Sequence, residues 1–200
     1  MSLRPVLMTV SNQTIPIRYL AKSYPMRDRD ADGRDDAWEV SVYKVFIQGV
    51  DAANKPVMKA WTALRFMPFW NDPASPDPGY RSKGFIVSGL NSFAKQVIKT
   101  YIRNYIIHNT YSAFNGAIQL KGNFLIHAGP HDYANFGWGG AGCVEVIGDF
   151  SNFKRDIAQM ANCKLTDMHA AMEQVVQQGK LSVELLHAAT PVFKSMGNFR

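Results

Sequence analysis

The chain has 200 residues, of which 46% are hydrophobic, and it carries a formal net charge of +6. This length and apolar content are enough to bury the core of one domain, so we expect a single domain over residues 1–200. The sequence has no apolar run long enough to span a membrane, and the short run at residues 6–10 is not the hydrophobic region of a signal peptide. We therefore expect a chain made as a soluble protein without a signal peptide.

The positive charge favours anionic partners such as nucleic acid, acidic membranes or cell-wall polymers. The basic residues are scattered along the chain, and neither a zinc-finger nor an RNA-binding motif occurs. We expect no nucleic-acid partner and no membrane span.

The first half of the chain predicts strands. Residues 6–10 and 15–19 form short apolar runs, and a charged loop follows. Residues 38–48 and 57–69 are rich in β-branched and aromatic side chains, and the polar turn between them predicts an antiparallel hairpin. Three prolines and a glycine in 71–79 indicate an exposed connection.

Residues 90–107 predict an amphipathic helix, because apolar side chains recur at steps of three and four. We expect it as a helical insertion at about residues 85–110, with a basic face of Lys95, Lys99 and Arg103 exposed to solvent.

The second half predicts both strands and helices. Strands are expected at 118–127, 143–147 and 181–187, and an irregular tail beyond Pro191. Helices are expected at 149–161 and 165–178, capped by Asp149 or Ser151 and by Thr166 or Asp167. The fold class is therefore α+β, with a mixed, largely antiparallel β-sheet core and helices packed on it.

The loop at 28–39 has the spacing of a twelve-residue calcium loop. Carboxylates at alternate positions converge as such a loop curls, Gly33 permits the bend, and a final Glu closes the site. The expected ligands are Asp28, Asp30, Asp32, the Arg34 carbonyl, Asp36 and Glu39. A solvated acidic loop balanced by nearby arginines is the alternative, and a bound Ca²⁺ would have a structural role.

The most informative segment is 118–150. An apolar strand ends on His127, and sixteen positions later a glycine-rich stretch leads through Gly142 into Cys143. An imidazole can take the proton of a thiol, and flexible glycines let a carbonyl substrate approach backbone amides. The alternatives are a buried core histidine with an inert buried cysteine, or a disulfide between Cys143 and Cys163.

The runs 122–130 and 140–146 resemble the catalytic core of the L,D-transpeptidase (YkuD-like) cysteine enzymes of peptidoglycan metabolism, whose core reads Ile-His-Gly and then Ser-His-Gly-Cys-Ile-Arg. The resemblance covers residues 118–150. It implies that Cys143 is the nucleophile, His127 its base and Gly142 the residue before the nucleophile. The family's Ser/Thr, second His and Arg fall on Gly140, Ala141 and Glu145. An inward Glu145 would disfavour a thiolate, and a backbone carbonyl could orient His127 in place of the missing side chain.

This resemblance implies a peptidoglycan-directed cysteine peptidase or transpeptidase that acts on stem-peptide amide bonds through a thioester, without a cofactor for catalysis. The residues expected to contact substrate are Gly129, His131, Trp138, Gly140 and Glu145. Compact enzymes of this kind without a signal peptide resemble wall-targeting secreted effectors or phage wall enzymes, and an effector would have an immunity protein as partner. The alternative is a non-catalytic, calcium-stabilised binding or structural domain on the same fold.

Overall fold

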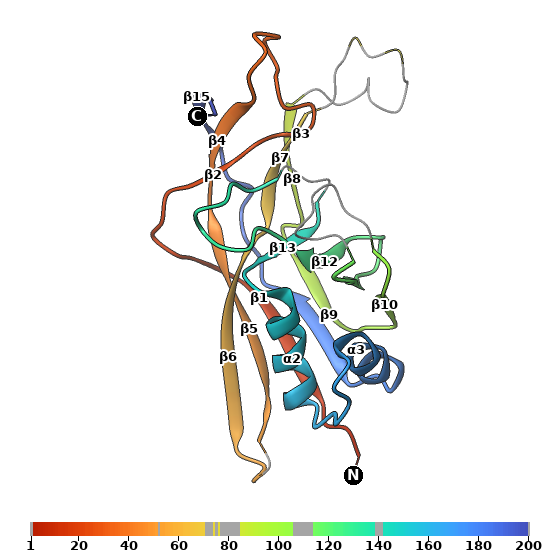
Figure 1. Ribbon diagram of the computed structural model, residues 1–200. Coiled ribbons are helices and arrows are strands. Elements are labelled where there is room, and N and C mark those ends of the chain that lie inside the picture. The colour runs from red at the N-terminus through yellow and green to blue at the C-terminus, as the bar shows by residue number, and fades with distance from the viewer. Residues whose placement is uncertain are drawn as a thin grey trace.

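The computed structural model describes residues 2–51, 53–70, 74, 76, 85–105, 114–138 and 142–199. Nine strands of this part of the chain form one large sheet: β1 (Val6–Thr14), β5 (Val42–Val50), β6 (Pro56–Leu64), β9 (Phe93–Val97), β10 (Thr100–Ile102), β11 (Ala117–Gln119), β12 (Leu125–Ala128), β13 (Val144–Ile147) and β14 (Leu181–Leu185). Their order is β10-β11-β12-β13-β6-β5-β1-β14-β9 (Figure 1). Neighbours are antiparallel except for β12 with β13 and β1 with β14. The expected α+β class with a mixed, largely antiparallel sheet is confirmed.

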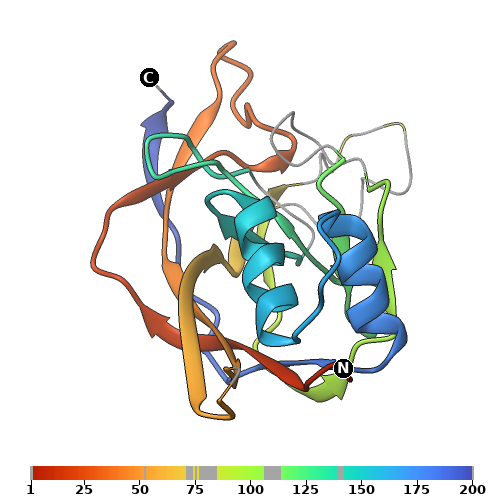
Figure 2. The same cartoon turned by 60° about the horizontal axis from the view of Figure 1, so that its bottom comes forward.

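Two helices, α2 (Phe150–Met160) and α3 (Met168–Gln177), lie side by side, and the sheet curls around them (Figure 2). Each helix starts at an aspartate whose carboxylate accepts backbone N–H groups of the first turn: Asp149 from Ser151 and Asn152, and Asp167 from Ala170. These side chains satisfy amides that have no partner within the helix. Both predicted helices and their caps are confirmed.

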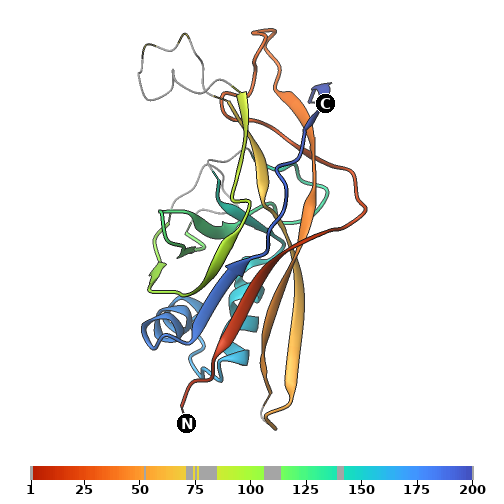
Figure 3. The ribbon, with the colours of Figure 1, turned by 180° about the vertical axis from the view of Figure 1, so that it is seen from behind.

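The main core lies between the helices and the sheet. It joins α2 residues such as Phe153 and Ile157 to inward residues of β1, β5, β12, β13 and β14. Seen from behind, β1 and β14 run side by side and the helices lie beyond them (Figure 3).

Two small sheets use the remaining strands: β2 (Tyr19–Ala21), β3 (Tyr24–Pro25), β4 (Asp36–Val40), β7 (Phe66–Trp70), β8 (Phe85–Gly89) and β15 (Lys194–Asn198). One has the order β15-β4-β2 and the other β3-β7-β8. A second apolar cluster joins Trp38 and Val40 of β4 to Leu64 of β6 and Ile147 of β13. The small sheet of β4 therefore packs against the large sheet on the face opposite the helices.

The predicted hairpin forms between β5 and β6, with Val50 paired to Pro56, but both predicted strands are longer than the observed ones. The run 38–48 divides into β4 and β5, and the run 57–69 into β6 and β7. Arg65, which lies at the second division, is fully buried and donates to the carbonyls of Ser11, Leu90 and Asn91. At each division the chain passes from one sheet into another. The run 118–127 also divides, into β11 and β12, but these two strands are antiparallel neighbours in the large sheet.

The predicted helix at 90–107 is wrong, and so is the helical insertion at 85–110 over its described part, residues 85–105. This segment contains β8, β9 and β10, and β9 pairs antiparallel with β14. Ile98 is fully buried between them, and its N–H donates to the Leu181 carbonyl. Val97, Ile98, Thr100 and Ile102 are β-branched, so they fit a pleated sheet better than a helix.

The tail beyond Pro191 also differs from the expectation of irregular structure. Residues 194–198 form β15, which pairs antiparallel with β4 through Ser195 and Trp38. Pairing with β4, which propensity does not encode, orders this polar segment.

Candidate active site

His127 lies on β12 and Cys143 directly precedes β13, and these two strands are parallel neighbours. The register pairs Ile126 with Val144 and His127 with Glu145. Ile126 and Val144 belong to the helix-side core, and side chains alternate between the two faces of a strand. His127, Glu145 and Cys143, which directly precedes β13, therefore share the face of the sheet that points away from the helices.

The His127 ring is oriented by the backbone. Its Nδ1 lies 2.9 Å from the carbonyl oxygen of Ala128, and the residue is 1% exposed. A carbonyl can only accept, so Nδ1 carries the proton and Nε2 is the basic nitrogen of the neutral ring. The expectation that a backbone carbonyl could orient His127 agrees with this contact.

Cys143 is a free thiol, as is Cys163, so the alternative of a disulfide between them is wrong. Burial raises the pKa of the Cys143 thiol to about 11; the Leu125 N–H, which donates to the sulfur, opposes this shift, and the Glu145 carboxylate adds to it. The thiol is therefore protonated at neutral pH. Cys163 lies beyond α2, and its Sγ donates to Gln174 Oε1 at 3.0 Å.

Glu145 points inward and is 1% exposed. Its negative charge raises the pKa of Cys143. Burial is the larger cause of the raised pKa of Tyr19, and the Glu145 charge adds to that shift. A Cβ added at Gly129 would lie 2.9 Å from the Glu145 Cβ, so this glycine permits the two segments to pack closely. The expected unfavourable effect of an inward Glu145 on a thiolate is confirmed.

Gly142 has φ +110, a conformation that side chains with a Cβ rarely adopt. A Cβ at this position would also lie 2.6 Å from Cε1 of Phe124. Two independent constraints thus require glycine immediately before Cys143.

The other predicted substrate residues are dispersed. His131 is exposed, lies 3.8 Å from the Asp132 carboxylate, and lines a cavity of about 250 Å³ beyond the carboxyl ends of β12 and β13. Trp138 packs against Phe136 with ring centroids 5.2 Å apart, and the Arg27 guanidinium lies over its ring. Gly140 lies outside the described residues. Among the predicted substrate residues that the structure describes, Glu145 pairs with His127 across the strands and Gly129 packs against Glu145.

Tyr105 also lies at the candidate site, and no pattern in the sequence indicated it. The Tyr105 ring lies 5.8 Å from the His127 ring, centroid to centroid. Burial raises the pKa of Tyr105 to about 12, and Cys143, Tyr24 and Glu145 add to the shift. Tyr105 falls within the predicted helix at 90–107, which does not form, so its position in the sequence gave no signal.

The predicted calcium loop is partly assembled. One carboxylate oxygen from each of Asp28, Asp30 and Asp32 lies within 4.8 Å of the others, so these three side chains could bind a divalent cation. Glu39 instead forms an ion pair with Arg18 at 3.1 Å, on β4. Asp36 accepts the N–H of Arg29, and the N–H of Arg34 donates to Asp32. The structure thus groups three of the six predicted ligands.

Comparison with known proteins gives no assignment: no protein-family model, no curated protein and no solved structure matches this chain. Neither helix of the described residues has the length and apolar character that crossing a membrane requires.

Proposed function

We propose that the protein is a cysteine-dependent acyl-transfer enzyme acting on amide bonds of peptidoglycan stem peptides, with an L,D-transpeptidase-like catalytic domain. The observation that supports this most is the parallel pairing of β12 and β13, which puts His127 and Cys143 on one face of the sheet. The Nδ1 contact to Ala128 supports a role for His127 as base, because it leaves Nε2 to accept a proton.

In this mechanism the thiol stays protonated until the substrate binds, because its pKa is about 11. His127 Nε2 takes the proton as Sγ attacks the amide carbonyl, and backbone amides at Gly142 and Cys143 stabilise the oxyanion. The C–N bond then breaks, His127 protonates the leaving amine, and a thioester remains. Attack by water gives a carboxypeptidase or endopeptidase, and attack by an amine gives a transpeptidase.

The test is incubation of purified peptidoglycan and soluble muropeptides with the unmodified protein and with Cys143→Ala, His127→Gln and Cys163→Ala. Mass spectrometry of the products should show cleaved or exchanged stem peptides with the unmodified protein and with Cys163→Ala. Cys143→Ala and His127→Gln should give none. Unchanged muropeptides in every sample, with and without calcium, would reject the proposal.

A second candidate function is a non-catalytic binding or structural domain. The buried Glu145 beside a protonated thiol favours it, because both oppose formation of a thiolate. The two functions differ in the role of His127. A binding domain forms no products, and His127→Gln should leave its ligand affinity unchanged.

Delivery to the wall as a secreted effector, with an immunity protein as partner, belongs to the same proposal. It predicts that expression directed to the periplasm is toxic and that Cys143→Ala abolishes the toxicity. Toxicity that persists in this variant would argue against it.

A further inference from the structure

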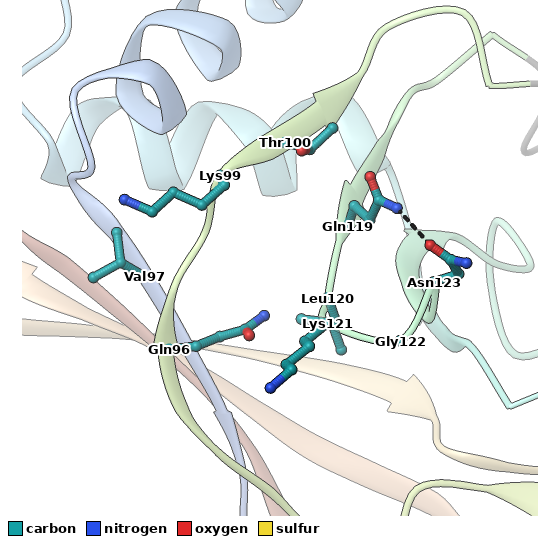
Figure 4. Close-up of a pocket in the computed structure, with 9 residues that line it drawn as sticks. All are labelled: Gln96, Val97, Lys99, Thr100, Gln119, Leu120, Lys121, Gly122 and Asn123. Carbon is teal, nitrogen blue, oxygen red and sulfur yellow. Dashed lines mark hydrogen bonds between the residues drawn. The ribbon is translucent and has the colours of Figure 1, made fainter.

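A pocket of about 410 Å³ opens between the β9–β10 segment and the turn that joins β11 to β12 (Figure 4). Its polar lining includes the ammonium group of Lys121, the amides of Gln96, Gln119 and Asn123, and the hydroxyl of Thr100, while the ammonium of Lys99 extends away from Lys121 (Figure 4). None of the described residues that line it carries a carboxylate. The pocket is therefore a concave surface of positive charge and amide groups.

The two lysines are available to an external anion. None of the ion pairs of the described residues involves Lys99 or Lys121. Figure 4 shows the side chains of Gln96 and Lys121 extending toward one another across the opening. Gln119 Nε2 donates to Asn123 Oδ1 at 3.0 Å, which fixes these two amides relative to each other. Ammonium and amide N–H groups together are donors suited to a carboxylate.

The Phe124 ring lies between the pocket and the segment that precedes the candidate nucleophile, Cys143. A Cβ at Gly122, which lines the pocket, would lie 3.5 Å from the Cδ2–Cε2 edge of the Phe124 ring. A Cβ at Gly142 would meet the opposite, Cδ1–Cε1 edge. The next residue, Leu125, donates its N–H to the Cys143 thiol. One aromatic ring thus separates the pocket from the segment before Cys143.

We propose that this pocket is a subsite for a free carboxylate of an acidic peptide substrate. The inference rests on the proposed function for the identity of the peptide, and it adds the substrate feature that the enzyme selects. A peptide that places its scissile carbonyl at Cys143 would extend past Phe124 and put a carboxylate between Lys121 and the Gln119–Asn123 pair.

The test compares a soluble stem peptide that has free carboxylates with the same peptide after carboxyl amidation. Affinity is measured by calorimetry on Cys143→Ala, which cannot form an acyl-enzyme. The free acid should bind about fivefold to tenfold more tightly, the range expected for one or two partly exposed charge pairs. Adding Lys121→Gln should reduce this preference to about twofold or less, and Lys99→Gln should reduce it to a smaller extent.

Lys95→Gln is the matched control, since Lys95 is an exposed lysine on β9, close in sequence to Lys99, and does not line the pocket. Equal affinity for both peptides, no detectable binding of either, or an equal loss with Lys95→Gln would overturn the subsite. The carboxylate preference is separate from turnover by the unmodified protein. If the protein prefers the free carboxylate but does not turn over muropeptides, the subsite stands and the proposed enzyme is rejected. If it turns over muropeptides without this preference, the proposed enzyme stands and the subsite is rejected.

Discussion

His127 and Glu145 occupy paired positions on the parallel strands β12 and β13, and each is 1% exposed. Buried charges strongly affect their neighbours because little water screens them. The same carboxylate raises the pKa of Cys143 and of Tyr105. A substitution at Glu145 can therefore change the pKa of the Cys143 thiol while Cys143 itself is kept.

Glu145→Gln should make Cys143 more reactive. Removing the charge lowers the pKa of the thiol but leaves most of its shift, because burial is the larger cause. Alkylation by iodoacetamide near pH 8 should then be about two- to threefold faster. The measurement uses a Cys163→Ala background, so that only one thiol reacts. An unchanged rate would show that the carboxylate has no influence on the sulfur.

Gly142→Ala should destabilise the fold by about 2–4 kcal/mol, since it combines backbone strain with a clash against Phe124. Gly197→Ala is the control: Gly197 also has positive φ, +72, but a Cβ there would meet nothing within 4 Å. This variant should cost about 1 kcal/mol, from backbone strain alone. Urea unfolding measures both variants, and equal losses would contradict the contact with Phe124.

Arg65→Met should lower the free energy of unfolding by about 3–5 kcal/mol, because the three carbonyls that the buried guanidinium contacts lose a charged donor. Arg65→Lys should not restore it, since one ammonium cannot reproduce the geometry of the guanidinium. Arg18→Met, at an exposed ion pair with Glu39, should change stability by no more than about 0.5 kcal/mol. Thermal and urea unfolding give these values, and a mild loss with Arg65→Met would mean that the carbonyls find other donors.

Lys154 should make stability depend on alkaline pH. Its ammonium is 1% exposed and donates to the Asn115 carbonyl, and burial lowers its pKa to about 8. In the unfolded chain its pKa is about 10.4, so the unfolded state binds more protons between these values and stability rises with pH. Relative to Lys154→Met, the unmodified protein should gain about 2–3 kcal/mol from pH 7 to about pH 10.5. Lys95→Met should show no such difference, and parallel pH curves for Lys154→Met and the unmodified protein would refute the assignment.

Calcium should stabilise the protein weakly through the three grouped aspartates. About 10 mM Ca²⁺ should raise the free energy of unfolding by about 1–2 kcal/mol, as for a low-affinity site. Asp30→Asn should abolish this gain, whereas Asp51→Asn, which alters a carboxylate that accepts amides in the hairpin turn, should retain it. Equal stabilisation by NaCl of the same ionic strength would indicate screening rather than binding.

The sequence predicted the elements whose signals are local. Asp149 and Asp167 cap their helices because the capping geometry involves only the next few residues. The β5–β6 hairpin follows from the same kind of short pattern. The sequence indicated His127 and Cys143 as a candidate pair, because an apolar strand ends on His127 and a glycine-rich stretch precedes Cys143.

The errors have a tertiary cause. The apolar residues of 90–105 recur at helical spacing. The segment instead contains β9 and β10, because β9 pairs with β14 and Ile98 is buried. Glu39 was expected in the calcium loop, whereas β4 pairs with β2 and β15 and directs it to Arg18. Tyr105 reaches the site only because β10 pairs with β11, and no short pattern encodes that pairing.

The parallel pairing of β12 with β13 requires the chain to leave the large sheet after Ala128 and return at Val144. On the way, Gly137 bridges to Ala21 of β2, and the hydroxyl of half-exposed Tyr133 lies 2.7 Å from Thr62 Oγ1. A single backbone cut beside Tyr133 would therefore put the proposed base and the proposed nucleophile on two separate polypeptides. Strand pairing and the core between the helices and the sheet would then hold them together, so the active centre would become a complex of two fragments whose assembly depends on their concentration.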